Sequence, residues 1–278
     1  MNILYCGDGN TIHGVLFSIL SLLENNKREM HFYIVTMESK ELNIKGITES
    51  SVKFLNELVK EYNSKSSVQR FDVTKFFLDN LPEANMKTRF TPCCMLRLYV
   101  DELKLPDKFL YLDYDVVCRK PIDSFYDMDV TDLEFIGVLD YYGKWWYPKK
   151  HFRFDYINSG VLLINFKKCL ETGLFKKCRT MCHDKKMLLP DQSALNKMAV
   201  LKKHVSPIYN EQKHLHSETV LQHFSTTFRF WPYFHPQSVK PWQKDRMHKL
   251  LHLYEYDDFI ERFENIDRKL IDYEKRTK

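Results

Sequence analysis

Two aspartates one residue apart, Asp113 and Asp115, directly follow an apolar and aromatic run at 109–112. Such a run is typical of a buried strand, and the carboxylates mark the point where the strand ends. Alternate residues of an extended backbone point the same way, so the two carboxylates can meet at one point in space. The pair suits a divalent cation that prefers oxygen ligands, Mn²⁺ or Mg²⁺, and requires a positive group nearby. Spacing alone would favour two solvated loop aspartates; the apolar setting favours a metal site.

A glycine-containing turn at 7–11 follows the first predicted strand. The turn has neither the G-x-G-x-x-G pattern of a dinucleotide fold nor the Gly-Lys-Ser/Thr of a phosphate loop. Asp8 can accept the ring N–H of a base such as uracil, and Asn10 can bond a ribose hydroxyl. For the turn taken alone, the better interpretation is that these two side chains only hold a tight turn.

Three further polar positions lie where helices or strands begin or end. Arg97, in a helix predicted at 91–103, could supply the positive group that the carboxylate pair requires, or could be an ordinary surface arginine. Asp140 follows a strand predicted at 135–139. Asp191 lies with Gln192 in the first turn of a helix that starts at a proline, where an acid also stabilises the helix dipole.

Strand and helix patterns alternate in the first part of the chain, which predicts a doubly wound α/β sheet with a ligand at the carboxyl ends of its strands. The predicted strands lie at 2–6, 31–36 and 67–73, and the predicted helices at 12–23 and 50–62. Further along, we expect a functional loop at 143–155, an Asn-Ser-Gly turn before an apolar strand within 156–165, one helix at 167–183, a strand at 220–224, and one or two amphipathic helices after residue 247.

The 278 residues are 44% hydrophobic and 28% charged, which predicts a soluble globular protein with one large domain or one domain and a small appendage. The net charge of +5 has no dense basic block, so nucleic acid is not an expected partner. Seven cysteines without zinc-binding spacing are expected to be reduced thiols, which indicates the cytosol. With no leader pattern and no membrane span, we expect a cytoplasmic protein, with the inner face of the membrane as an alternative location.

Taken in order, these segments resemble glycosyltransferase family 8, whose members are retaining enzymes with a single sheet domain. The strongest matches are 109–115 and 156–165, followed by 190–196, with Arg97-Leu98 and Lys240-Pro241-Trp242 in support. The resemblance implies one nucleotide-sugar-binding doubly wound domain of glycosyltransferase A type, with a mostly parallel mixed sheet. It predicts a catalytic domain over 1–243 and a helical appendage over 244–278.

The resemblance also implies an activity, which is Mn²⁺-dependent transfer of glucose or galactose from a UDP-sugar to a glycan or glycosylated protein, with Mg²⁺ as a substitute. Asp113, Asp115 and His223 would bind the cation, and Gln192 and Asp191 would be the catalytic residues. The implied donor contacts are Asp8, Asn10, Thr11, Arg97, Asp113, Tyr114, Asp115, Asp140, Asn158 and Lys240. The acceptor would meet the loop at 141–155 and the aromatic region after residue 223.

The segment after the proposed metal histidine departs from the family pattern, in which a glycine and then Lys-Pro-Trp follow closely. Here no glycine follows His223, and Lys240 is distant. His235 lies closer to Lys240 and is the rival ligand; His223 is preferred because it ends a predicted strand. Retention by a covalent intermediate and retention by same-face attack both stay open.

Two other function classes remain to be weighed. A non-catalytic member that binds UDP-sugar or a partner is the main alternative to the enzyme. A nucleotidyltransferase or phosphatase is disfavoured because further acidic ligands and a phosphate loop are missing from the sequence. The amphipathic C-terminal helices are compatible with weak contact to a membrane surface or to a second copy of the chain.

Overall fold

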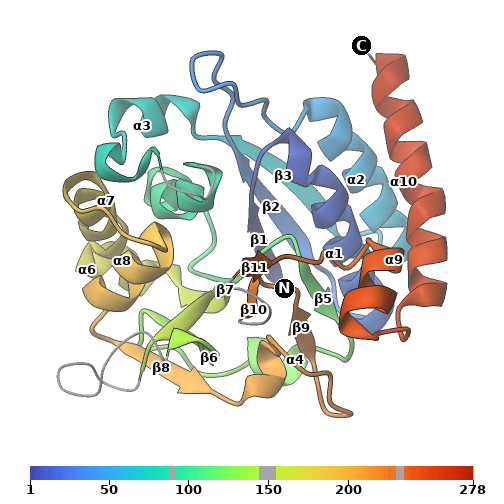
Figure 1. The fold of residues 1–278 in the computed structure, drawn as a ribbon. Coiled ribbons are helices and arrows are strands. Elements are labelled where there is room, and N and C mark those ends of the chain that lie inside the picture. Colours follow the sequence, from blue (N-terminus) through green and yellow to red (C-terminus); the bar gives the residue numbers. More distant parts are fainter. Residues whose placement is uncertain (88–91, 144–154, 230–234, 278) are drawn as a thin grey trace.

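The computed structural model describes residues 1–87, 92–143, 155–229 and 235–277 (Figure 1). Its centre is a seven-stranded sheet with the strand order β3-β2-β1-β4-β7-β6-β8. These strands are β1 Asn2–Cys6, β2 His31–Thr36, β3 Ser67–Asp72, β4 Lys108–Leu112, β6 Phe135–Leu139, β7 Ile157–Asn165 and β8 Lys202–Val205. Two short antiparallel ladders pair β5 Val116–Cys118 with β9 Leu221–His223, and β10 Thr227–Arg229 with β11 His235–Gln237.

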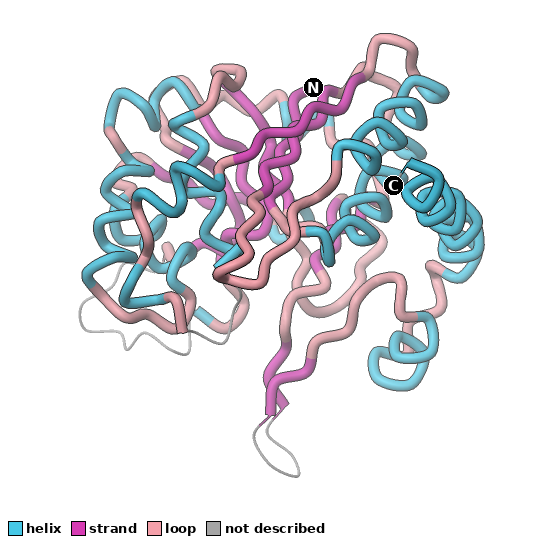
Figure 2. Tube along the Cα trace, turned by 90° about the horizontal axis from the view of Figure 1, so that it is seen from above, coloured by secondary structure: helices cyan, strands magenta, loops and turns pink. Residues whose placement is uncertain are grey.

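Helices cover both faces of the sheet (Figures 1 and 2). The α-helices are α1 Ile12–Asn25, α2 Glu49–Tyr62, α3 Thr74–Asp79, α4 Asp123–Tyr126, α6 Phe166–Thr172, α7 Leu174–Asp184, α8 Pro190–Met198, α9 Lys244–Arg246 and α10 Asp257–Thr277. Shorter turns are the 3₁₀ helices η1 Gly9–Thr11, η2 Glu83–Asn85, η3 Pro92–Glu102 and η4 Pro207–Tyr209, and the π-helical turn η5 Met247–Leu251.

Alternate residues of the central strands contribute to two separate apolar cores. On β1, Ile3 and Tyr5 pack with α1, α2 and α10, whereas Leu4 and Cys6 pack with η3, α6, α7 and α8. This alternation follows from the two-residue period of a strand whose faces are both covered. The α/β class and the doubly wound arrangement predicted from the sequence are therefore confirmed.

Strand β7 runs opposite to its two neighbours, β4 and β6, while the other pairs in the central sheet are parallel. The start of β7 therefore lies at the same edge of the sheet as the ends of β4 and β6. The Asn-Ser-Gly turn expected before this strand is wrong, because Asn158, Ser159 and Gly160 are strand residues. The Asn158 side chain bonds Asp140 and the Ser159 N–H bonds Gln192, two contacts that the local sequence does not reveal.

Two predicted helices differ from the observed ones. The single helix expected at 167–183 is two helices, because Gly173 adopts a left-handed conformation with φ +64° that closes α6 and precedes α7. The helix expected at 91–103 is the 3₁₀ helix η3, and residue 91 lies outside the described residues. Most side chains of η3 are buried, so packing on several sides determines its geometry and no single apolar stripe does. The loop expected at 143–155 falls almost entirely outside the described residues.

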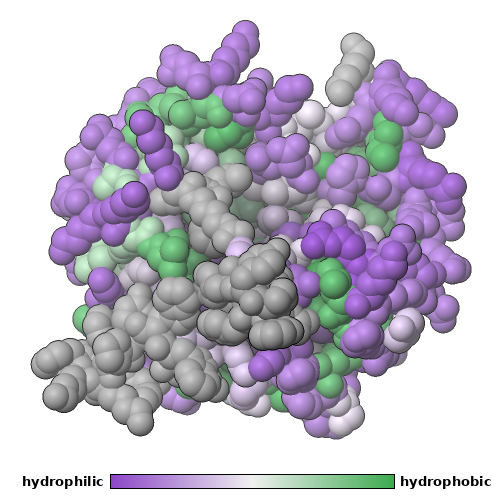
Figure 3. Space-filling view, viewed as in Figure 1, coloured by the Kyte–Doolittle hydropathy of each residue, from purple (hydrophilic) through white to green (hydrophobic). Residues whose placement is uncertain are grey.

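Helix α10 lies along α1 and α2 at the side of the molecule (Figures 1 and 2). Its inner face places Ile260, Phe263 and Leu270 in the core that contains Phe17 of α1. The face of the molecule shown in Figure 3 is mostly hydrophilic, with small separate hydrophobic areas. Among the described helices, none combines the length and the apolar character needed to span a bilayer.

Candidate active site

An open pocket of about 460 Å³ lies where β4, β6 and β9 end and β7 begins. Its wall contains every residue that the sequence analysis assigned to the donor, the cation or catalysis: Asp8, Asn10, Thr11, Arg97, Asp113, Tyr114, Asp115, Asp140, Asn158, Asp191, Gln192, His223 and Lys240. The fold thus brings residues from both ends of the chain to one cavity, at the sheet edge where ligands of such folds bind.

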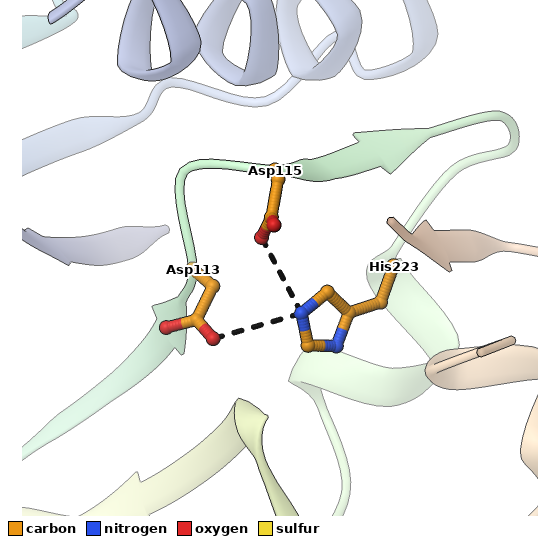
Figure 4. Close-up of side chains that lie close together, drawn as sticks. All are labelled: Asp113, Asp115 and His223. Carbon is orange, nitrogen blue, oxygen red and sulfur yellow. Dashed lines mark ion pairs between the residues drawn. The ribbon is translucent and has the colours of Figure 1, made fainter. Parts of the chain in front are cut away.

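The cation cluster consists of Asp113, Asp115 and His223, whose ligand atoms all lie within 4.8 Å of one another. Figure 4 shows both carboxylates directed toward the imidazole. His223 Nε2 is 3.6 Å from Asp113 Oδ2 and 3.3 Å from Asp115 Oδ1. The β5–β9 ladder pairs Val116 with His223, so the backbone register holds the histidine beside the loop between β4 and β5.

Gly160 of β7 gives the histidine room to approach. A Cβ atom at this position would lie 2.1 Å from His223 Cε1 and 2.9 Å from Asp113 Oδ2. Any larger residue would therefore displace the imidazole or the carboxylate. Two carboxylates and one imidazole nitrogen that converge in this way form a donor set suited to a divalent ion such as Mn²⁺.

Two positive side chains stabilise the carboxylate pair. Arg97 Nη2 donates to Asp113 Oδ1 at 2.7 Å, and Lys240 Nζ donates to Asp115 Oδ2 at 2.5 Å. Burial alone would raise the pKa of Asp115, but Lys240 and His223 together hold it well below its usual range. The positive group expected beside the pair is confirmed. It consists of two side chains, of which Arg97 bonds Asp113 and Lys240 bonds Asp115.

Arg97 also connects the cluster to the first turn of α8. Its Nε lies 3.3 Å from Asp191 Oδ2, its Nη1 donates to the Ser159 carbonyl at 2.6 Å, and its guanidinium stacks 4.0 Å from the centroid of the Tyr111 ring. Burial raises the pKa of Asp191, and Arg97 opposes that shift. Asp191 is thus held by a buried ion pair in addition to its place in the helix.

The opposite wall is a network of amides around Asp140. Asp140 Oδ2 accepts from Gln192 Nε2 at 3.1 Å and from Asn158 Nδ2 at 3.0 Å. Gln192 Oε1 accepts from the Ser159 backbone N–H at 2.9 Å. Because both ends of the Gln192 amide are bonded, this side chain has a fixed orientation at the pocket wall.

The turn after β1 forms the remaining wall. Asp8 Oδ1 accepts from the Asn10 backbone N–H at 3.0 Å, and Thr11 Oγ1 donates to the Asp8 carbonyl at 2.7 Å. Asp8 therefore holds the turn and also lines the pocket. At the far side, the Tyr114 ring lies 4.8 Å from Lys240 Nζ.

Sequence reasoning did not single out several residues that complete the site. Tyr111 donates to Asp113 Oδ1 at 2.7 Å, and Asn210 Oδ1 lies 3.2 Å from His223 Nδ1. Tyr111 lies inside the apolar run, and Asn210 lies in a segment with no regular pattern, so neither carried a signal of its own. Among the described side chains, the histidine of the cation cluster is His223. The rival ligand, His235, lies in β11, and its side chain is outside the described ones.

The comparisons with known proteins agree with this geometry. The model of Glycosyl transferase family 8 matches residues 2–246. A putative glycosyltransferase of Haemophilus influenzae is 25% identical over 203 residues, which cover 70% of this chain and 58% of the relative. The lipopolysaccharide 1,2-glucosyltransferase of Escherichia coli is 26% identical over 200 residues, which cover 69% of this chain and 56% of the relative. The chain thus spans little more than half the length of these two relatives.

Solved structures share the fold at low sequence identity. The galactosyltransferase LgtC, in complex with donor and acceptor sugar analogs, superposes with a TM-score of 0.66 at 20% identity over 96% of this chain and 95% of that chain. The bifunctional glycosyltransferase WbbM gives a TM-score of 0.68 at 16% identity over 98% of this chain and 51% of that chain. These likenesses confirm the expected glycosyltransferase A type of fold. Together with the family model, which covers most of the sequence, they lead to one conclusion: the chain belongs to glycosyl transferase family 8.

Proposed function

We propose that this chain is a retaining glycosyltransferase that moves glucose or galactose from a UDP-hexose to a glycan or glycosylated-protein acceptor, with Mn²⁺ as its cation. The observation that carries the proposal is the Asp113, Asp115 and His223 cluster on the wall of a pocket that also holds the expected nucleotide and sugar contacts. The names of the relatives, which include lipopolysaccharide glucosyltransferases and a lipopolysaccharide 1,3-galactosyltransferase of Salmonella typhimurium, support hexose donors and a bacterial surface glycan as acceptor.

The cation cluster would hold Mn²⁺ through one oxygen of each aspartate and through His223 Nε2, and Mg²⁺ could take the same place. A bound divalent cation supplies positive charge that stabilises the diphosphate of a departing UDP. Arg97 already binds the other oxygen of Asp113, so this carboxylate is oriented before any ligand arrives.

Lys240 is the second source of positive charge for the leaving group. Its ammonium group is bonded to Asp115, and its side chain is 23% exposed toward the pocket. A diphosphate bound beside the cluster would lie within reach of this group, and fixed positive charge there stabilises the transition state more than the ground state. On the other side, Asp8, Asn10 and Thr11 would contact the nucleoside.

The sugar would lie against the wall formed by Arg97, Asp140, Asn158, Asp191 and Gln192. The carboxylate and amide groups of this wall are suited to sugar hydroxyls. We assign Gln192 and Asp191 the place beside the anomeric carbon. The bonds of Gln192 to Ser159 and Asp140, and the ion pair of Asp191 with Arg97, support this role because they fix both side chains in advance.

The catalytic unit in this proposal is residues 1–243, and residues 244–278 form the helical appendage. The experiment is isothermal titration of the purified protein with UDP, UDP-glucose, UDP-galactose, ADP and GDP, in Mn²⁺ and in chelator. We expect Mn²⁺-dependent binding of UDP and of one UDP-hexose, and no binding of ADP or GDP. Hydrolysis of the bound UDP-hexose without acceptor would then identify an enzyme. Metal-dependent binding without turnover would instead identify a non-catalytic member of the family, and no metal-dependent binding would refute the donor class.

A further inference from the structure

Asn210 is a buried residue directly behind the cation cluster, and only 1% of its surface is exposed. It follows the 3₁₀ helix η4 and is not among the residues that line the pocket. Its Oδ1 lies 3.2 Å from His223 Nδ1, and its Nδ2 donates to Asn158 Oδ1 at 3.0 Å. Asn210 therefore lies behind the pocket wall and contacts two residues that line it.

The backbone around Asn210 is tied to the strand that carries the histidine. The Glu211 N–H donates to the Leu221 carbonyl at 2.9 Å, and the His223 N–H donates to the Glu211 carbonyl at 2.8 Å. The Asn210 N–H donates to the Pro207 carbonyl at 2.9 Å. These bonds hold the segment that carries Asn210 beside the strand that carries His223.

The orientation of the Asn210 amide is determined by a chain of obligate partners. The Gly160 backbone N–H can only donate, and it donates to Asn158 Oδ1 at 3.0 Å. The Asp140 carboxylate accepts from the other end of the same amide, Asn158 Nδ2, at 3.0 Å. The Asn158 oxygen therefore faces Asn210. Asn210 must donate to it through its NH₂ group, which leaves the Asn210 oxygen facing His223.

An amide oxygen can only accept, so the nitrogen that faces it, His223 Nδ1, must carry a proton. The other ring nitrogen, Nε2, then faces Asp113 and Asp115 and is the atom that a cation held between them would bind (Figure 4). We propose that Asn210 is a positioning residue that keeps the proton of His223 on Nδ1 and aims Nε2 at the two carboxylates. The consequence for cation affinity rests on the proposed function.

The same hydrogen bonds extend beyond the cation cluster. Asp140 Oδ2, which accepts from Asn158, also accepts from Gln192 Nε2 at 3.1 Å. One continuous series of bonds therefore runs from His223 through Asn210, Asn158 and Asp140 to Gln192. Outer partners of this kind orient metal ligands, and their loss typically costs about 10–100-fold in metal affinity.

Two variants separate the acceptor role of Asn210 from its size. Asn210→Leu keeps the branched shape of the side chain and removes both the acceptor and the donor, whereas Asn210→Asp keeps an acceptor for Nδ1 and loses only the donor to Asn158. The first readout is ¹⁵N NMR of histidine-labelled, metal-free protein at about pH 9, which is above the ordinary imidazole pKa of about 6.5, with His223 assigned by its absence in a His223→Gln sample. The second readout is Mn²⁺ affinity, measured by the electron paramagnetic resonance of free Mn²⁺.

We expect wild type and Asn210→Asp to carry the proton on Nδ1 and to bind Mn²⁺ similarly. In Asn210→Leu the proton should move to Nε2, where Asp115 can accept it, and Mn²⁺ affinity should fall by about 10–100-fold. Asn85→Leu is the matched control, because Asn85 is a buried amide that bonds the Cys182 and Lys185 carbonyls away from the pocket. It should lower stability and change neither readout.

The proposal is overturned if wild type carries the proton on Nε2, a result that does not depend on whether Asn210→Leu folds. It is also overturned if Asn210→Leu keeps the Nδ1 proton and the Mn²⁺ affinity, or if Asn210→Asp loses both. A wild type with an Nδ1 proton that depends on Asn210, but with no Mn²⁺ binding, would support the positioning role and refute the proposed cation site.

Discussion

The cation cluster and the interface between α10 and α1 both join parts of the chain that are far apart in sequence. The cluster consists of charged and polar side chains, whereas the centre of the interface consists of apolar ones. The cluster gathers charged groups, Asp113, Asp115 and His223, and Lys240 bonds one of them. The interface is apolar at its centre, where Phe263 packs edge-on against Phe17 with ring centroids 4.9 Å apart. Ion pairs between the two helices flank this apolar centre.

This difference separates what a residue contributes to activity from what it contributes to stability. Desolvation makes buried charges expensive, so a paired charge cluster adds little to the free energy of folding and is explained by chemistry. Buried aromatic surface contributes directly to the free energy of folding and has no role in chemistry. Substitutions in the cluster should therefore lower activity, and substitutions in the interface should lower stability.

The largest effect is expected for Asp115→Asn. The amide keeps the shape of the side chain but loses the charge needed for a divalent cation, so release of UDP from a UDP-hexose should fall below detection. The circular dichroism spectrum and a cooperative thermal transition should remain, because the partly exposed Lys240 can turn toward solvent. Asp129→Asn, at an exposed carboxylate that bonds Thr131, is the control and should keep full activity. Undiminished turnover in Asp115→Asn would refute the cation site.

Phe263→Ala tests the other half of the comparison. The side chain is 4% exposed, so its removal should cost about 3–5 kcal/mol in the free energy of unfolding. Mn²⁺ affinity measured well below the unfolding transition should not change. Glu264→Ala, on the exposed face of the same helix, should change stability by less than about 0.5 kcal/mol. Denaturant titration measures both, and equal losses in the two variants would show that α10 is not anchored by its apolar face.

Gly160→Ala should lower both cation affinity and stability through a change at one site. The added methyl group would meet the His223 imidazole, so Mn²⁺ affinity should fall by about 10–100-fold. Gly173→Ala is the matched control, since a Cβ there meets nothing within 4 Å and the positive φ alone should cost about 1 kcal/mol. Equal Mn²⁺ affinity in the two alanine variants would contradict the close approach of His223 to β7.

The smallest effect concerns the rim of the α10 interface, where His13 Nδ1 lies 2.5 Å from Asp267 Oδ1. The hydrogen bond to Asp267 raises the pKa of His13, against the opposing effect of burial. The stabilisation is therefore complete below the unfolded-state pKa of about 6.5 and is lost as the pH rises through the higher folded-state value.

A double-mutant cycle with His13→Gln and Asp267→Asn measures this coupling. Because the imidazole is partly exposed, the coupling should stay below about 1 kcal/mol at about pH 5.5 and vanish near pH 9. The cycle is run by thermal unfolding at both pH values. A coupling that is equal at the two values would assign the contact to a neutral hydrogen bond.

Periodicity predicted most strands and helices, because both faces of the sheet are covered and the apolar residues recur at strand or helix intervals. It failed where tertiary partners determine the backbone. Asn158, Ser159 and Gly160 resemble a turn in sequence, yet they form a strand because Asp140, Gln192 and Asn210 satisfy their polar groups. The break at Gly173 was visible only as a glycine within an otherwise helical pattern.

The candidate site divides in the same way. The pocket residues were predicted from short motifs in a family order, and the fold brings them to one pocket. Asn210 was missed because its partners, His223 and Asn158, lie 13 and 52 positions away and share no local pattern with it. Residues that act on a ligand leave motifs, whereas residues that orient them depend on contacts between distant segments.

The positions of the cluster residues in the sequence also determine the order in which they are synthesised. A ribosome delivers the chain from its N-terminus, so Asp113 and Asp115 emerge long before His223 and Lys240. A translation product that stops before residue 223 contains the acidic pair without its histidine ligand and without the lysine. Such incomplete copies cannot form the cation cluster, and any activity that depends on it begins only after residues 223 and 240 have been synthesised.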